Sequence, residues 1–174
     1  MDIITALAIS IGLLGAVATY LFLTLGTIQI WIGFIGWASF YHCGGGTDGL
    51  RKSVLANLWG VLMAFIALLL ITQLNPGLPG VIWPSIVVGV MAAILVLGSK
   101  IPAFGVIPAT VYGFASTAGY GLLDPAAIPA LTTATLANPL ICVSLSLVIG
   151  GLFGIVSEKF AGMIKGAYPA ASKA

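Results

Sequence analysis

Long apolar segments separated by short turns fill almost the whole of this 174-residue chain. A helix needs about 20 mostly apolar residues to cross a bilayer, and most of these segments are near that length. Only 6% of the residues are charged, against about 25% in a soluble domain. The sequence therefore predicts an all-α polytopic membrane protein with six transmembrane helices, in which residues 1–174 form a single membrane domain. The predicted spans are Ile3–Leu25, Ile28–Cys43, Leu50–Leu74, Val81–Leu97, Pro102–Leu123 and Ala130–Val156.

Prolines modify the last two predicted spans. Pro108 and several glycines lie in the fifth, so a kink or a broken helix is expected there. In the sixth, Pro139 is expected one or two turns inside the helix. Residues 158–174 predict a short, mildly basic tail that lies on the membrane or is disordered. At the other end, no basic stretch precedes Ile3, which favours a true first span over a cleaved signal peptide.

A glycine-rich, charged turn joins the second and third spans and contains Cys43, three consecutive glycines, Asp48, Arg51 and Lys52. Glycines permit backbone conformations that other residues avoid. Asp48 is predicted to cap the following helix by accepting a hydrogen bond from its free amides. Cys43 and Cys142 lie in different hydrophobic surroundings at a spacing that fits no metal motif, so both are predicted to be free thiols.

The basic residues fall at alternate turns of the predicted topology. With the N-terminus inside, all 6 Lys and Arg lie in the second turn, the fourth turn or the C-terminal tail, whereas the outer loop before the sixth span contains Asp124. Basic residues favour the cytoplasmic side of a membrane. The sequence therefore predicts that both the N- and the C-terminus are cytoplasmic.

A short motif recurs in the two halves of the chain. Leu55-Ala56-Asn57, near the start of the third span, reappears as Leu136-Ala137-Asn138 near the start of the sixth. Three spans per half would make the second half enter the membrane inverted, an arrangement that points to a transport site. We therefore predict a 3+3 inverted repeat, with pseudo-repeats over residues 3–74 and 81–156 and both asparagines approaching the midplane. The alternative is chance recurrence in a chain rich in Leu and Ala.

The predicted spans hold no Asp, Glu, Lys or Arg deep in the membrane. Transporters that run on protons keep ionisable side chains there. An enzyme would need an acid–base pair or a metal cluster, but the chain has 1 histidine, His42. We therefore expect no enzymatic activity, no cofactor, no metal and no nucleic-acid partner.

Neutral polar groups are the remaining candidates for a function inside the membrane. An amide in lipid is costly unless it is hydrogen-bonded, so Asn57 and Asn138 should face another helix or a wet cavity. Nearby hydroxyls can replace the hydration shell of a small polar solute, and an aromatic stripe on the second span can form a narrow constriction. The predicted pore-lining or solute-binding residues are Asn57, Asn138, Thr110, Ser116, Thr135, Trp37, Tyr41 and His42, with Arg51 and Lys52 at the cytoplasmic mouth.

Each of these assignments has a purely structural alternative. The asparagines can tie helices together, and the aromatic stripe can pack in the core or contact lipid. His42 can be a structural cap at a helix end, and Arg51 and Lys52 can serve only to fix the orientation. Gly150 and Gly154 form a small-xxx-small pattern that packs helices within or between protomers, and a thin bundle of short helices predicts a homo-oligomer.

Two runs of residues resemble a known family. They are Phe40–Gly46 with Gly49-Leu50 after it, and Val106–Gly113. Together with the first two spans, they resemble small six-span bacterial inner-membrane proteins grouped as a domain of unknown function. That resemblance implies six helices and the bacterial inner membrane, without a settled activity.

A weaker resemblance rests on Trp31, the glycine turn, Leu50-Arg51-Lys52 and Gly60. These residues resemble the membrane half of fusaric-acid-resistance and aluminium-activated malate transport proteins, which implies passage of organic anions. The cytoplasmic domain of those proteins is missing from this sequence.

The sequence predicts an inner-membrane channel or facilitator for a small polar solute. The solute is a neutral amide such as urea, or a small organic anion. The alternative is a structural or accessory membrane subunit without a pore.

Overall fold

The computed structural model describes residues 1–74 and 76–167, and in these residues every regular element is helical. The prediction of an all-α protein is confirmed. The α-helices are α1 (Ile3–Leu25), α2 (Ile30–His42), α3 (Gly46–Gln73), α4 (Ile82–Gly98), α5 (Ile107–Leu123) and α6 (Pro139–Ala167). Two short 3-10 helices, η1 (Pro102–Phe104) and η2 (Pro129–Thr132), lie in the connections before α5 and α6.

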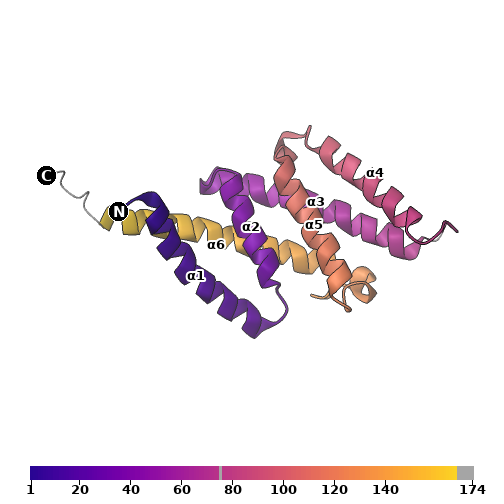
Figure 1. The fold of residues 1–174 in the computed structure, drawn as a ribbon, viewed down its shortest axis with the longest axis horizontal. Coiled ribbons are helices and arrows are strands. Elements are labelled where there is room, and N and C mark those ends of the chain that lie inside the picture. The colour runs from indigo at the N-terminus through magenta and orange to yellow at the C-terminus, as the bar shows by residue number, and fades with distance from the viewer. Residues whose placement is uncertain (75, 168–174) are drawn as a thin grey trace.

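The two longest helices organise the bundle. α3 and α6 extend along the long dimension of the molecule in opposite directions, and the shorter α2 and α5 cross them near the middle (Figure 1). α2 packs chiefly on α6, and α5 packs chiefly on α3. α1 then covers α6 at one end, and α4 covers α3 at the other. Each short helix of one half therefore packs on the long helix of the other half.

Glycines allow these crossings to be close. A Cβ atom on Gly60 or Gly113 would strike the backbone of the facing helix at the α3–α5 crossing. At the α2–α6 crossing the same holds for Gly36 and Gly150. Close backbone approach of this kind is typical of membrane helices, where small residues at the interface increase van der Waals contact. Gly154 packs under the Phe40 ring of the same chain, so the small-xxx-small pattern of α6 serves packing within the protomer.

The outer surface is apolar, as expected for a protein in lipid. Large aliphatic side chains are exposed along α1 and α4, among them Leu23 at 69% and Val90 at 52%. Within residues 1–74 and 76–167, three helices are long and apolar enough to cross a membrane: α1, α3 and residues 139–166 of α6. α4 is a shorter apolar helix, and α2 is about 20 Å long against a hydrocarbon core of about 30 Å. The chain is a membrane protein, and six crossings stay a prediction.

The start of α6 differs from the prediction. Pro139 is the first residue of the helix, not a residue one or two turns inside it, and Asn138 precedes the helix. Proline suits this position because its missing N–H would have no partner in the first turn. Pro108 likewise stands at the start of α5, so the expected break lies before it, between η1 and α5.

The C-terminal end of α6 also differs. The helix continues to Ala167, so residues 158–167 are helical and do not form a surface tail. The last seven residues of the predicted tail, 168–174, lie outside the described residues, as does Asn75.

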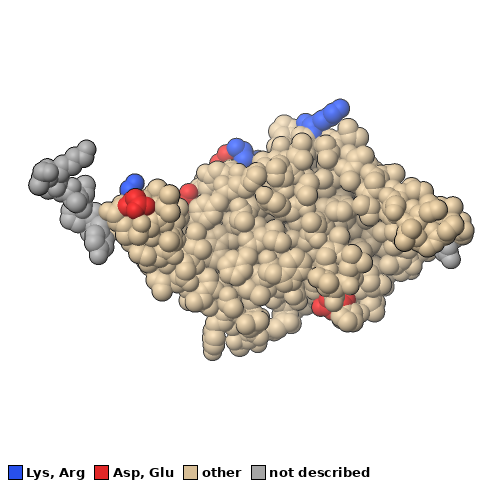
Figure 2. All heavy atoms as spheres, in the orientation of Figure 1, with Lys and Arg blue, Asp and Glu red and all other residues tan. Residues whose placement is uncertain are grey.

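Charge is distributed unevenly between two edges of the molecule. The Lys and Arg side chains visible in Figure 2 lie along the edge that carries the α2–α3 turn and the α4–α5 connection and at the end of the molecule where α6 finishes, with Asp and Glu side chains among them. Asp124 follows α5 and therefore lies at the end of that helix opposite the α4–α5 connection.

At the N-terminus, Asp2 caps α1 by accepting from the Thr5 amide at 2.9 Å. Hydrogen bonds from the Thr5 hydroxyl and amide hold the pKa of Asp2 below its usual value.

Candidate functional site

A closed ring of three hydrogen bonds lies in the core between α2 and α3. The Ser39 hydroxyl donates to Asn57 Oδ1 at 3.1 Å, and Asn57 Nδ2 donates to Ser53 Oγ at 3.3 Å. The Ser53 hydroxyl donates back to Ser39 Oγ at 2.9 Å, which completes the ring. The three residues are 0%, 1% and 1% exposed in the order Ser39, Ser53, Asn57. Each hydroxyl is thus both a donor and an acceptor in an otherwise apolar core.

The helices place these groups together for simple reasons. Ser53 and Asn57 are one turn apart on the same face of α3. α5 closes the site from the other side, because Gly113 packs directly on the Asn57 backbone. A buried amide without partners would destabilise the fold by several kcal/mol, on the order of the cost of transfer to an apolar medium. The ring removes most of that cost and ties α2 to α3.

Polar groups continue from the ring toward the charged edge. Cys43 follows α2 and is partly buried. Beyond it, the Tyr112 hydroxyl lies 3.2 Å from His42 Nδ1 at an exposed position. Both described cysteines are free thiols, as predicted.

Asn138 has a different environment from Asn57. Its Oδ1 accepts from the Leu140 amide at 2.9 Å, so the side chain caps the N-terminus of α6. Its Nδ2 donates to the carbonyls of Leu131 at 3.2 Å and Thr133 at 2.8 Å. The structure therefore places Asn138 in the loop before α6, not inside the helix as predicted. The two asparagines share no hydrogen-bond partner, and Thr135 lies exposed in this same loop.

Ser116, in the middle of α5, is one of two buried hydroxyls that lack a hydrogen-bond partner in the described residues; the other is Ser99, which follows α4. The Ser116 side chain is 1% exposed, and its Oγ has no hydrogen-bond partner within the described part of the chain. Thr110, also buried, satisfies its hydroxyl by donating to the Ile107 carbonyl at 2.8 Å. Buried hydroxyls without a partner are rare in folded proteins, so Ser116 needs an explanation.

Trp37 and Tyr41 face α6 instead of the Asn57 ring. Trp37 Nε1 donates to Ser157 Oγ at 2.9 Å, and the Tyr41 hydroxyl lies 2.7 Å from the same atom. The Ser10 hydroxyl of α1 donates to the Ser157 carbonyl at 2.7 Å. Ser157 thus joins α1, α2 and α6. Sequence reasoning missed it because the charged residues that follow it resembled the beginning of a tail.

Glu158 caps α3 from another helix. Its Oε2 accepts from the Gly46 amide at 2.8 Å, where the first amides of α3 are free. Gly45 has a φ of 70°, and a Cβ there would strike the Glu158 carboxylate, so glycine is required. The prediction that Asp48 caps α3 is wrong, because Asp48 forms an exposed ion pair with Lys52 at 2.6 Å. A carboxylate at a helix N-terminus is also favoured by the helix dipole.

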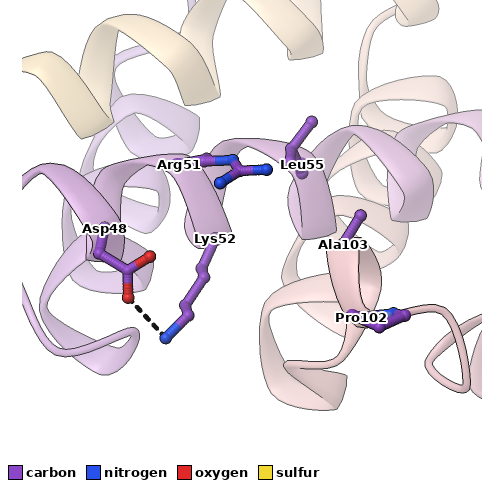
Figure 3. Close-up of a pocket in the computed structure, with 6 residues that line it drawn as sticks. All are labelled: Asp48, Arg51, Lys52, Leu55, Pro102 and Ala103. Carbon is purple, nitrogen blue, oxygen red and sulfur yellow. Dashed lines mark ion pairs between the residues drawn. The ribbon is translucent and has the colours of Figure 1, made fainter.

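The predicted mouth residues line a small surface pocket of about 190 Å³ (Figure 3). Its lining consists of Asp48, Arg51, Lys52, Leu55, Pro102 and Ala103. The pocket therefore lies between the first turns of α3 and η1.

The three side chains of the ring, those of Ser39, Ser53 and Asn57, can form hydrogen bonds, and none of them is ionisable. The described residues contain no group of three or more His, Cys, Asp or Glu suited to a metal ion. Amides and hydroxyls of this kind can bind a neutral polar molecule or a weakly hydrated anion through exchange of hydrogen bonds.

Comparison with families of proteins places most of the chain in one group. The family described as "Protein of unknown function (DUF1097)" matches residues 8–162. No curated protein and no solved structure matches the chain. The resemblance to fusaric-acid-resistance and malate transport proteins gains no support from these comparisons. The match covers nearly the whole membrane bundle, and the chain belongs to the DUF1097 family.

Proposed function

We propose that this chain is a channel or facilitator that carries a small polar solute across the bacterial inner membrane. The solute is a neutral amide such as urea, or a small organic anion. The observation that carries the proposal is the Ser116 hydroxyl, which is 1% exposed and has no hydrogen-bond partner in the described residues. A polar solute that reaches α5 would supply the missing partner.

We infer an inverted 3+3 repeat as part of this proposal. Gly36-Trp37-Ala38-Ser39 in α2 and Gly113-Phe114-Ala115-Ser116 in α5 share the pattern Gly-aromatic-Ala-Ser. Gly36 packs on the Leu147 backbone of α6, and Gly113 packs on the Asn57 backbone of α3. The two motifs therefore make corresponding contacts with the long helix of the opposite half. Inverted repeats of this kind surround the substrate site in many transporters.

Such a repeat would explain why Ser116 has no partner among the described residues. Ser39 and Ser116 are the last residues of the two matching motifs, and Ser39 bonds to Asn57. Gly113 packs on Asn57, and the matching residue Gly36 packs on Leu147. Leu147 therefore takes the place of Asn57 in the second half, and it has no polar side chain. In the first half the Ser39 hydroxyl is bonded to Asn57. In the second half the Ser116 hydroxyl would be free to bond to a solute.

The polar groups along the proposed path would contact the solute in different ways. Ser116 would bind the solute, and the ring of Ser39, Ser53 and Asn57 would exchange hydrogen bonds with it as it passes. A net hydrogen bond contributes about 0.5–1.5 kcal/mol, so such exchange costs little once the solute replaces the ring partner. Arg51 and Lys52 would lie at the cytoplasmic mouth, with both termini on the same side of the membrane.

The second candidate is a structural or accessory membrane subunit without a pore. The closed ring favours it, because Asn57 already joins α2 and α3 without any solute. In that case Trp37, Tyr41, Thr110, Thr135, His42 and Asn138 would have packing and capping roles alone.

Flux into proteoliposomes separates the two candidates. We would reconstitute the purified full chain and measure uptake of urea, acetamide, glycerol, lactate and malate against protein-free vesicles. Transport predicts uptake of at least one solute, and Ser116→Ala should reduce that uptake several-fold. Thr24→Val is the control, because Thr24 is exposed and its hydroxyl bonds only within α1, to the Tyr20 carbonyl. Absence of uptake for the whole panel, with correctly folded protein, would favour the accessory subunit.

A further inference from the structure

We propose that the pocket between α3 and η1 binds the phosphate group of an anionic phospholipid. The pocket has a volume of about 190 Å³ and is open on the edge of the molecule where the basic side chains gather. It is distinct from the Asn57 ring, and the proposal does not depend on transport.

The charges in the pocket leave Arg51 available. Lys52 pairs with Asp48 at 2.6 Å, so these two charges largely compensate each other. Arg51 is exposed and forms no ion pair within the described residues. Its guanidinium extends toward Leu55 and away from the Asp48 carboxylate (Figure 3). A guanidinium binds phosphate through two parallel hydrogen bonds, which makes it well suited to a lipid headgroup.

The pocket lining changes from polar to apolar along α3 from Arg51 to Leu55, as the binding of a lipid headgroup and its glycerol backbone would require. Leu55 follows Arg51 by one turn on the same face of α3, and Trp59 follows by another turn. Pro102 and Ala103 of η1 form the opposite wall. The Arg51 guanidinium and the aliphatic side chain of Leu55 beside it match the order of phosphate and glycerol backbone in a phospholipid.

Trp59 packs against η1, the short helix that forms one wall of the pocket. Its ring stacks on Phe104, the last residue of η1, with centroids 4.9 Å apart and an interplanar angle of 6°. Trp59 Nε1 donates to the Leu95 carbonyl at 3.1 Å. Tryptophan is enriched at the level of the lipid headgroups, where an apolar ring and a polar N–H both find suitable surroundings. This pair therefore indicates that the adjoining pocket lies at headgroup level, within reach of anionic lipids.

Thermal unfolding of the full chain in detergent tests the proposal. Dioleoyl phosphatidylglycerol should raise the melting temperature of the wild type, and dioleoyl phosphatidylcholine should raise it less. Arg51→Gln should weaken the apparent affinity for phosphatidylglycerol about tenfold, and Arg51→Lys should weaken it less. Lys165→Gln, in the last turn of α6, removes a positive charge from a residue that does not line the pocket and should respond like the wild type.

Three outcomes would overturn the proposal. The first is equal stabilisation by the two lipids. The second is an unchanged response to phosphatidylglycerol in Arg51→Gln, since the free side chain leaves no reason for this variant to misfold. The third is a full response to soluble glycerol phosphate, which would assign the pocket to a soluble phosphate ester instead of a membrane lipid.

Discussion

The buried serines of this bundle differ in whether their hydroxyls have hydrogen-bond partners. Ser39 and Ser116 occupy the same place in two matching motifs, and both are buried. The Ser39 hydroxyl bonds to Asn57 and accepts from Ser53, whereas the Ser116 hydroxyl has no partner in the described chain. We therefore expect these two chemically identical side chains to contribute to stability with opposite signs.

Alanine substitutions of these two serines should separate their roles. Ser39→Ala opens the ring and leaves Asn57 and Ser53 each short of a partner, which should lower the free energy of unfolding by about 1–2 kcal/mol. Ser116→Ala removes an unsatisfied hydroxyl, so the free energy of unfolding should stay the same or rise by up to about 1 kcal/mol. Reversible unfolding in mixed micelles measures both. Equal destabilisation by the two variants would show that Ser116 has a bonding partner.

Residue-level features were predictable where a local rule applies. Asn57 is buried and bonded to another helix, as the cost of an amide in lipid requires. Asn138 carried a signal that would have placed it correctly, because Asn before Pro is typical of a helix start. The partner of Asn57 could not be deduced, since it depends on how α2 crosses α3.

Contacts at helix ends and at helix crossings hold the helices of this bundle together. Glu158 of α6 holds the N-terminus of α3, and Ser157 beside it joins α1 and α2. These contacts explain why α6 continues through a charged sequence that resembles a tail. Sequence alone reveals the charge of Glu158, but its partner is an amide more than a hundred residues away, which no local pattern indicates.

Substitution of Glu158 tests this cap. Glu158→Gln keeps the shape and removes the charged acceptor at the start of α3, which should lower the free energy of unfolding by about 1 kcal/mol. Lys159→Gln is the matched control on the next residue, which is exposed and should change stability by no more than about 0.5 kcal/mol. A variant Glu158→Gln as stable as the control would mean that the cap is dispensable.

The glycine crossings make a second prediction for the elements. Gly113→Ala places a methyl group against the Asn57 backbone and should destabilise the protein by about 1–3 kcal/mol or more. Gly12→Ala in α1 meets no atom within 4 Å, so it should be neutral or stabilise the helix by about 0.5–1 kcal/mol. Unfolding of both variants under the same conditions is the measurement. Similar effects would contradict the close α3–α5 crossing.

At the scale of the whole molecule, the apolar pattern predicts the helical class and the approximate bounds of α1 to α5. The edge on which the basic side chains gather also agrees with the predicted turns (Figure 2). The packing of α2 on α6 and of α5 on α3 was not predictable, because the Leu-Ala-Asn motif does not indicate how the helices cross. In the structure one asparagine lies inside α3 and the other before α6, while the matching contacts belong to Gly36 and Gly113.

Access of polar molecules to Ser116 tests the transport proposal most directly. A Ser116→Cys variant, made in a chain without Cys43 and Cys142, would be reconstituted and exposed to a small, membrane-impermeant methanethiosulfonate reagent. Ala126→Cys, at an exposed loop position, serves as the positive control. We expect the cysteine at position 116 to be modified, and a transported solute to slow that modification. An unmodified cysteine at position 116, under conditions in which the one at position 126 reacts fully, would contradict a polar path through the bundle.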